Sequence, residues 1–350
     1  MHKFYLLPVL LFVCINLKGQ VYDGPESCEK DYTDGGVFVS NANAGNIVKL
    51  MPGGNLVSFA SGFTSGPHGL ELIGDTLYAC DGANIVLVNR STGAFINTVN
   101  LGASFLNGIT HVGKNLFITD FSAKRIYRLN TANNTFNVFA STLTKTPNGI
   151  IYDYLNNRLV YCCWGSSAPV YEISLSDSTI NLLATTATAN CDGIAMNCQG
   201  EFFIASWSPN AIKKYDPTFS SSTTLSLSGI GSPADIYFDL VDDTLYIPNS
   251  GNNTVTETDQ PSCFNSVECY CGIIDNTQIY PNPLSDHLII ENNGGFELFK
   301  MIDARGRVVF SSELANSINS FSLENISPGI YFVHLLSGKH VRTIKVCKEK

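Results

Sequence analysis

The sequence predicts an all-β protein in which a six-bladed β-propeller is followed by a small C-terminal β-sandwich. Three observations support this prediction: a composition suited to short strands and turns, six similar segments that recur about every 40 residues, and a change of pattern near residue 260.

The composition favours strands and disfavours long helices. Of the 350 residues, 44% are hydrophobic and only 15% are charged, and 29 Gly and 14 Pro interrupt the chain frequently. Runs of Ala, Leu, Glu and Lys, which favour helices, are absent. The net charge of −9 and the lack of a basic stretch argue against nucleic acid as a partner, because a phosphate backbone would be repelled.

Six segments share one pattern of strand, turn and strand, with a third strand after them and often a fourth before the next repeat. They begin at Gly24, Gly66, Phe105, Thr146, Asn190 and Ser232. A four-stranded unit of about 40 residues is typical of a propeller blade. A sandwich also alternates strands with turns, but it does not repeat one pattern six times. Because a single blade cannot bury both its faces, we expect six blades stacked around an axis over residues 20–260.

The first 19 residues have the layout of a secretory signal peptide. Basic Lys3 precedes an apolar stretch from Phe4 to Leu17, and polar residues follow. The stretch is shorter than the ~20 residues of a membrane span, and no later segment reaches that length. The sequence therefore predicts export and no membrane span.

Ten of the 11 cysteines follow the predicted signal peptide, and export allows disulfides to persist. If residues 191–198 form a strand, Cys191 and Cys198 lie too far apart to pair with each other. Cys263, Cys269 and Cys271 lie in a Cys-rich linker, residues 261–275. No His accompanies them, so a linker disulfide is favoured over zinc. The remaining pairings stay open.

Residues 276–350 form a separate module. It opens with Tyr-Pro-Asn-Pro from Tyr280, continues through a turn at Gly306 and a strand from Gly329 to Val333, and ends in a Lys-rich tail. Alternating strands and Gly turns indicate a small sandwich, and an ordinary adhesive sandwich is the alternative. The motifs closely resemble the C-terminal sorting domain of the bacterial type IX secretion system. That resemblance implies passage through the periplasm and, by the type IX machinery, to the cell surface or the medium.

One position recurs where the innermost strand of each predicted blade begins. It is occupied by Glu26, His68, Asn107, Asn148, Asp192 and Ala234. Because innermost strands line the central channel, five polar side chains should converge there. Two carboxylates and two amide oxygens are hard ligands whose two negative charges match calcium. The alternative is that these residues only form turns, because Asn-Gly and Asp-Gly are common turn dipeptides.

This ring resembles the calcium-dependent propellers that include regucalcin and the gluconolactonases (the SMP-30/gluconolactonase-like proteins), the paraoxonases and the diisopropylfluorophosphatase. The resemblance implies that Glu26, Asn107, Asn148 and Asp192 hold a calcium ion and that His68 is a catalytic base. Two features depart from the pattern: Glu26 follows a proline where the gluconolactonases place it before one, and no second histidine stands near His68.

Two functions stay open from the sequence. The first is a secreted calcium-dependent hydrolase of lactones or small esters, in which the metal polarises a carbonyl. The second is a non-catalytic propeller that binds a glycan, a peptide or a surface partner. The turns at 120–124 and 249–253 resemble those of NHL-type binding propellers and favour the second. Trp164 and Trp207 follow neighbouring strands, where packing is favoured over a sugar platform.

Overall fold

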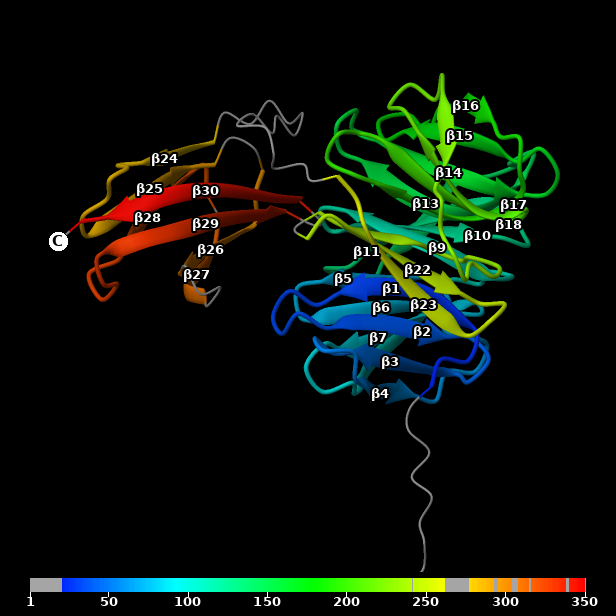
Figure 1. Ribbon diagram of the computed structural model, residues 1–350, viewed down its shortest axis with the longest axis horizontal. Helices are drawn as coiled ribbons and strands as arrows, with labels where there is room; N and C mark the ends of the chain where they lie inside the picture. The colour runs from blue at the N-terminus through cyan, green and yellow to red at the C-terminus, as the bar shows by residue number, and fades with distance from the viewer. Residues whose placement is uncertain are drawn as a thin grey trace, which may run out of the picture.

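The structure, a computed structural model, is all-β and consists of a six-bladed propeller and a small sandwich, as predicted (Figure 1). It describes residues 21–240, 242–261, 277–292, 295–303, 308–314, 316–337 and 340–349. The predicted signal peptide and all but the first residue of the predicted Cys-rich linker lie outside these ranges. Within them, no helix is long and apolar enough to cross a membrane.

Blades 1 to 3 are each a four-stranded antiparallel sheet whose strands follow chain order. Blade 1 contains β1 (Pro25–Lys30), β2 (Val37–Asn41), β3 (Asn46–Leu50) and β4 (Leu56–Ser61). Blade 2 contains β5 (Leu70–Ile73), β6 (Thr76–Asp81), β7 (Asn84–Asn89) and β8 (Phe95–Asn100). Blade 3 contains β9 (Leu106–Val112), β10 (Asn115–Asp120), β11 (Arg125–Asn130) and β12 (Phe136–Ala140).

Blades 4 to 6 continue the same order. Blade 4 contains β13 (Thr146–Asp153), β14 (Arg158–Trp164), β15 (Pro169–Ser174) and β16 (Ile180–Thr185). Blade 5 contains β17 (Ala189–Met196), β18 (Phe202–Ser208), β19 (Asn210–Tyr215) and β20 (Ser222–Thr224). In its described part, blade 6 contains β21 (Tyr237–Asp239), β22 (Thr244–Asn249) and β23 (Thr254–Asp259).

Alternation along each strand sends successive side chains to the two neighbouring blades. In β2, Phe38 belongs to the hydrophobic cluster between blades 1 and 2, whereas Val37 and Val39 belong to the cluster between blades 6 and 1. One cluster of this kind fills each of the six blade interfaces in the described residues. The core is therefore divided among interfaces, and each blade is stabilised by its neighbours.

The inner strands approach each other closely at the start of the central channel. A Cβ atom added to Gly108, Gly149 or Gly193 would lie 2.4–2.6 Å from the carbonyl oxygen of the next blade's inner strand. Only glycine permits this approach. The Asn-Gly and Asp-Gly dipeptides of β9, β13 and β17 therefore lie inside strands and do not form hairpin turns.

The ring closes between the last blade and the first. The backbone N–H of Asp235 donates to the carbonyl oxygen of Glu26 at 2.8 Å, and Ser27 and Asp235 form a parallel β-bridge. Between blades 2 and 3, the N–H of Gly69 donates to the carbonyl oxygen of Asn107 at 3.0 Å. These bonds hold the first residues of the inner strands in one layer around the axis.

The C-terminal module is a two-sheet sandwich with its own core (Figure 1, orange and red). One sheet contains β24 (Gln278–Tyr280), β25 (His287–Glu291) and β28 (Ile318–Ser322). The other contains β26 (Leu298–Asp303), β27 (Val308–Glu313), β29 (Gly329–Ser337) and β30 (His340–Lys348). Leu288, Phe299 and Val333 are fully buried between the sheets.

The described cysteines of the propeller are mostly free thiols. Cys198 forms a disulfide, whereas Cys191 is free and buried, so these two are not joined, as predicted. The adjacent Cys162 and Cys163 belong to different hydrophobic clusters, because successive side chains of β14 face opposite blades. Both are packing residues of the core.

Candidate functional site: the channel mouth

Four of the predicted site residues lie at or near the start of inner strands and are buried. Glu26 lies in β1, Asn107 in β9, Asn148 in β13 and Asp192 in β17, with exposures of 7%, 5%, 1% and 2%. His68 lies just before β5 and is partly buried. We call these four buried residues, together with Asp235 of blade 6, the channel mouth.

Asn148 and Asp192 are in direct contact. The Asn148 Nδ2 donates to Asp192 Oδ1 at 2.8 Å and to the carbonyl oxygen of Cys191 at 3.3 Å. The other amide atom, Asn148 Oδ1, is buried and has no hydrogen-bond partner among the described residues, and the same holds for Asn107 Oδ1. Leaving a buried acceptor unsatisfied costs about 1–3 kcal/mol. These two amide oxygens are therefore acceptors that a donor or a cation would satisfy.

A third carboxylate lies beside the two predicted ones. Asp235 Oδ2 accepts a hydrogen bond from Ser27 Oγ at 2.8 Å. Burial, followed by the charge of Asp235, raises the pKa of Asp192 to about 8. Burial and the charges of Asp192 and Asp235 raise the pKa of Glu26 well above its usual range. Burial and the neighbouring negative charges thus disfavour the ionisation of Glu26 and Asp192.

Sequence reasoning did not find Asp235. The alignment of repeats took Ala234 as the blade 6 residue, which supplies no ligand, and the structure places Ala234 at the equivalent position. The next residue is glycine in blades 2 to 5, but it is Asp235 in blade 6. The replacement of glycine by an aspartate at this one position is the sequence feature that indicates Asp235 as a site residue.

The oxygen atoms of the channel mouth can hold a hard cation only if carboxylate and amide oxygens bind it together. Among the described residues, no three His, Cys, Asp or Glu side chains lie close enough to form a metal cluster by themselves. The two orphaned amide oxygens and the crowded carboxylates are the features that a cation would satisfy. An all-oxygen, irregular set of this kind suits calcium better than magnesium.

His68 is a neutral histidine at the edge of this layer. Burial lowers its pKa to about 4, although the charge of Asp81 acts in the opposite direction. Its Nδ1 is buried without a hydrogen-bond partner among the described residues, and its ring meets Phe105 edge-on at 4.7 Å between centroids. Asp81 accepts hydrogen bonds from the N–H groups of Thr64 and Ser65, so its carboxylate is already engaged by a loop.

Four aromatic rings continue from His68 around the mouth, and we call them the aromatic arc: Phe105, Phe121, Trp164 and Trp207. Successive centroids are 5.9, 5.9 and 5.1 Å apart, each pair edge-to-face or steeply inclined, and all four residues are partly exposed. The indole of Trp207 lies beside Asp192, its Nε1 is buried, and its N–H acts to lower the pKa of the Asp192 carboxyl. Both tryptophans of the chain are in the arc.

The arc follows from one repeated position. Phe121, Trp164 and Trp207 occupy the same place in blades 3, 4 and 5, at or just past the end of the second strand. In blades 1, 2 and 6 the residues there are Ala42, Gly82 and Ser250. One half of the rim is therefore aromatic and the other half carries small side chains.

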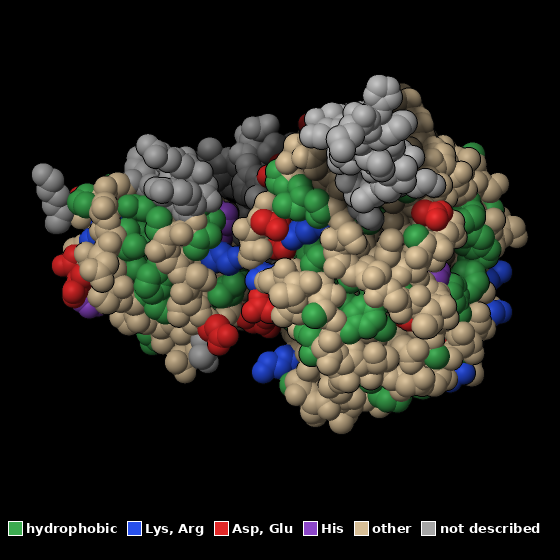
Figure 2. Space-filling model, turned by 90° about the horizontal axis from the view of Figure 1, so that it is seen from below, with side chains coloured by type: hydrophobic (Ala, Val, Ile, Leu, Met, Phe, Trp, Pro, Cys, Tyr) green, Lys and Arg blue, Asp and Glu red, His purple; other side chains and the backbone are tan. Residues whose placement is uncertain are grey.

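The surface charges do not indicate a polyanionic partner. On the face seen in Figure 2, acidic and basic side chains are interspersed among neutral ones, and no continuous basic patch is visible. With a net charge of −9, electrostatic attraction to nucleic acid is not expected.

Similar solved structures share the propeller fold. A streptogramin B lyase structure matches 69% of this chain and 85% of its own, with a TM-score of 0.53 and 17% identity. A structure from a nidogen/laminin complex covers 81% of this chain and 95% of its own, with a TM-score of 0.53 and 14% identity. A Bacteroides thetaiotaomicron protein of unknown function covers 68% and 69%, with a TM-score of 0.57 and 12% identity. At these identities the likeness concerns the fold alone.

No curated protein matches the chain. The family model for the secretion system C-terminal sorting domain matches residues 278–349. This agrees with the motifs from Tyr280 onward and with the separate sandwich that those residues form. The C-terminal module is therefore a secretion system sorting domain, and the type IX secretion system carries this propeller protein to the cell surface or the extracellular space.

Proposed function

We propose that the exported propeller binds a calcium ion at the channel mouth and uses it to hold an oxygen-bearing ligand. Glu26 and Asp192 supply carboxylates, and Asn107 and Asn148 supply amide oxygens. The observation that carries the proposal is the pair of buried, unpartnered amide oxygens beside carboxylates whose pKa values are raised. A bound divalent cation satisfies both oxygens and removes the repulsion among the carboxylates.

Four protein side chains leave part of the calcium coordination shell open to a substrate or a bound ligand. Calcium takes six to eight oxygen ligands, whereas four side chains provide fewer unless both carboxylates bind bidentately. The remaining positions are open to water or to a carbonyl, carboxyl or hydroxyl oxygen of a ligand. A ligand bound there lies next to the aromatic arc, which presents apolar ring surface on one side only.

If the protein is an enzyme, the reaction that this site suits is hydrolysis of a lactone or a small ester. Calcium would polarise the carbonyl and hold the developing oxyanion. His68 is neutral at pH 7 and therefore able to accept a proton, although a pKa of about 4 makes it a weak base. Streptogramin B lyase and virginiamycin B lyase, which share the fold at 17% and 14% identity, are enzymes by name, so lyase activity belongs in the same assay.

The aromatic arc favours the second candidate, a non-catalytic propeller that binds a glycan or a peptide. Rings in partly exposed positions on three successive blades provide a platform for the apolar face of a sugar or for an aromatic side chain. Among the described residues, Asp81 is the carboxylate whose charge acts on His68, and it is already engaged by the N–H groups of its own loop.

Intrinsic fluorescence tests the shared part of both forms, since Trp164 and Trp207 are the chain's only tryptophans. Calcium titration should change the emission saturably in the full-length protein, and Trp207→Phe should remove most of the change because Trp207 lies nearer Asp192. Asn148→Ala should weaken binding, whereas the matched surface variant Asn133→Ala should not. Unchanged emission, together with no calorimetric heat, would contradict calcium binding.

A panel of lactones and aryl esters then separates the two forms. Calcium-dependent turnover that His68→Gln lowers, with calcium affinity unchanged, supports the hydrolase. Absence of turnover in calcium-loaded protein, with saturable binding of an oligosaccharide or peptide, supports the non-catalytic form.

A further inference from the structure

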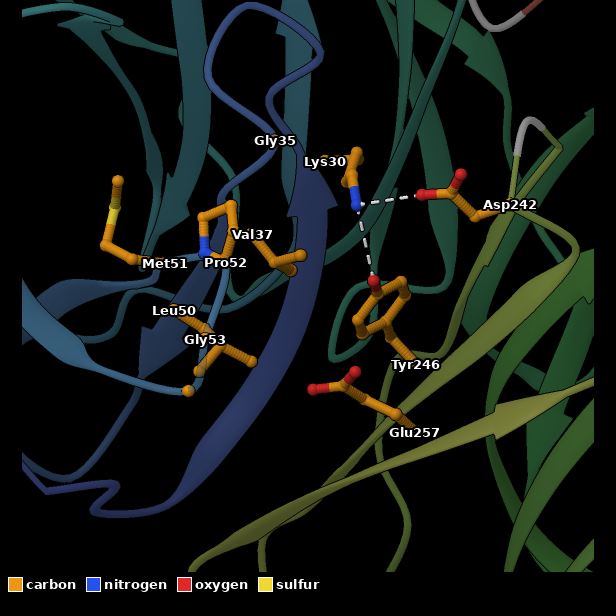
Figure 3. A pocket seen from close by; sticks show the side chains of 11 residues that line it. Lys30, Gly35, Val37, Leu50, Met51, Pro52, Gly53, Asp242, Tyr246 and Glu257 are labelled. Atoms are coloured by element: carbon orange, nitrogen blue, oxygen red, sulfur yellow. Dashed lines mark hydrogen bonds and ion pairs between the residues drawn. The ribbon is translucent and has the colours of Figure 1, made fainter. Parts of the chain in front are cut away.

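A cavity lies at the seam where blade 6 meets blade 1, and no residue of the channel mouth lines it. Its volume is about 300 Å³, at the small end of the range for ligand sites (Figure 3). The blade 1 wall is largely apolar and includes Val37, Leu50, Met51 and Pro52. Nothing in the proposed calcium site involves these residues. We call this space the seam cavity.

The blade 6 wall carries the acidic groups. Asp242, Tyr246 and Glu257 line it, and Glu257 extends from β23 toward Leu50 and Gly53 across the cavity (Figure 3). Asp242 and Glu257 are exposed at the rim, whereas Tyr246 is only 6% exposed and forms part of the floor. Acidic and apolar walls thus face each other across a short distance.

One lysine lies at the floor, and its charge is already compensated. Lys30 Nζ lies 3.4 Å from Asp239 Oδ2 and 3.3 Å from Asp242 Oδ2, and it donates to the Tyr246 hydroxyl at 3.4 Å. Its side chain is 9% exposed. The cavity and its immediate surroundings therefore hold one positive and three negative charges. Among the described residues Glu257 forms no ion pair, so it is the carboxylate of this group that has no cationic partner.

We propose that the seam cavity binds a primary alkylammonium group. The ammonium lies at the Glu257 end, away from Lys30, and its alkyl stem packs against Val37, Leu50 and Met51. An anionic ligand is disfavoured because three carboxylates repel it and Lys30 is already paired. A purely apolar ligand leaves Glu257 without a partner and gains only the short apolar wall. A lysine side chain of a peptide and a free aliphatic amine share the required chemistry.

The expected affinity is modest. An ion pair at an exposed rim contributes little, and a short stem contacts only one wall, so a dissociation constant on the order of 1–10 mM is expected for a simple amine. Salt should weaken binding, because the Glu257 carboxylate is exposed to solvent.

The methionines provide a site-specific readout. The chain has four, and Met51 lines the seam cavity, whereas Met196 and Met301 are buried in other hydrophobic clusters. In full-length protein labelled with ¹³C at the methionine methyl groups, n-pentylamine should shift the Met51 signal saturably. The Met196 and Met301 signals should stay fixed and also report that the fold is intact.

Two comparisons decide the outcome. Acetyl-lysine-amide, with its side-chain amine free, should shift Met51, and acetyl-norleucine-amide, which lacks the ammonium, should not. Binding of n-pentylamine without acetyl-lysine-amide would assign the site to free amines and still support the proposal. Glu257→Gln should raise the dissociation constant about two- to fivefold, whereas Glu313→Gln, an exposed glutamate of the sandwich, should leave it unchanged. Equal shifts with norleucine-amide, or an unchanged constant in Glu257→Gln, would overturn the proposal.

Discussion

Replacing Asp192 with Asn should stabilise the calcium-free protein and abolish its stabilisation by calcium. The unfolded chain releases the Asp192 proton near pH 3.8, whereas the folded protein holds it up to about pH 8. Folding at pH 7 therefore costs the uptake of a proton, and a neutral amide of the same shape avoids that cost. This proton uptake corresponds to roughly 4 kcal/mol at pH 7, because that pH lies about three units above the pKa of the unfolded chain.

The sign of the pH dependence follows from the same shift. Because the native state binds the proton that the unfolded state has lost, the stability of calcium-free protein should fall as pH rises from about 4 to about 8. Calcium binds the ionised form and should reverse this trend, so its stabilising effect should grow over the same range.

Thermal unfolding across pH 4 to 9, with calcium and with chelator, measures both effects. For a domain of this size, roughly 4 kcal/mol corresponds to a rise in Tm of about 8–16 °C in chelator for Asp192→Asn. Calcium should add stability to the wild type and none to the variant. If Asp192→Asn lowers the Tm in chelator, or if calcium stabilises both proteins equally, the reasoning about this carboxylate is wrong.

Three further predictions concern other parts of the molecule. His68 should titrate near pH 4 by NMR, and a midpoint near pH 6.5 would contradict its burial. Because the unfolded chain protonates this histidine near pH 6.5, the protein should lose stability as pH falls from 6.5 to 4, and His68→Gln should reduce that loss. Gly193→Ala should destabilise the propeller by about 2–4 kcal/mol in urea unfolding, because its Cβ would lie 2.4 Å from the Ala234 oxygen, whereas Gly329→Ala meets nothing closer than 3.6 Å and should be nearly neutral. Deleting residues 278–350 should leave a folded propeller inside the cell envelope, and its appearance in the medium on immunoblots would refute the role of the sorting domain.

The fold was predictable because each blade repeats the same strand pattern in the same phase. The alternation in β2, with Phe38 facing one blade and Val37 and Val39 the other, is local in sequence and needs only a neighbour on each side. The sorting domain was predictable for a different reason: its motifs are contiguous. Neither prediction depended on knowing how distant residues meet.

The site was only partly predictable, because its remaining members depend on register and on blade contacts. Asp235 stands where four other blades have glycine, so aligning the repeats on the preceding residue passed over it. Phe121 contacts Trp164 across a blade interface, and no local pattern indicates this. The seam cavity joins Lys30 to Asp242, 212 residues away, and appears only when the ring closes.

The most direct test of the calcium site is the anomalous scattering of a crystal grown with calcium. We predict a single strong peak in the channel mouth, bounded by Asn107 Oδ1, Asn148 Oδ1 and the carboxylates of Glu26 and Asp192, and its loss in crystals of Glu26→Gln. A mouth without a peak, in crystals whose calcium concentration saturates any calorimetric binding, would contradict the account.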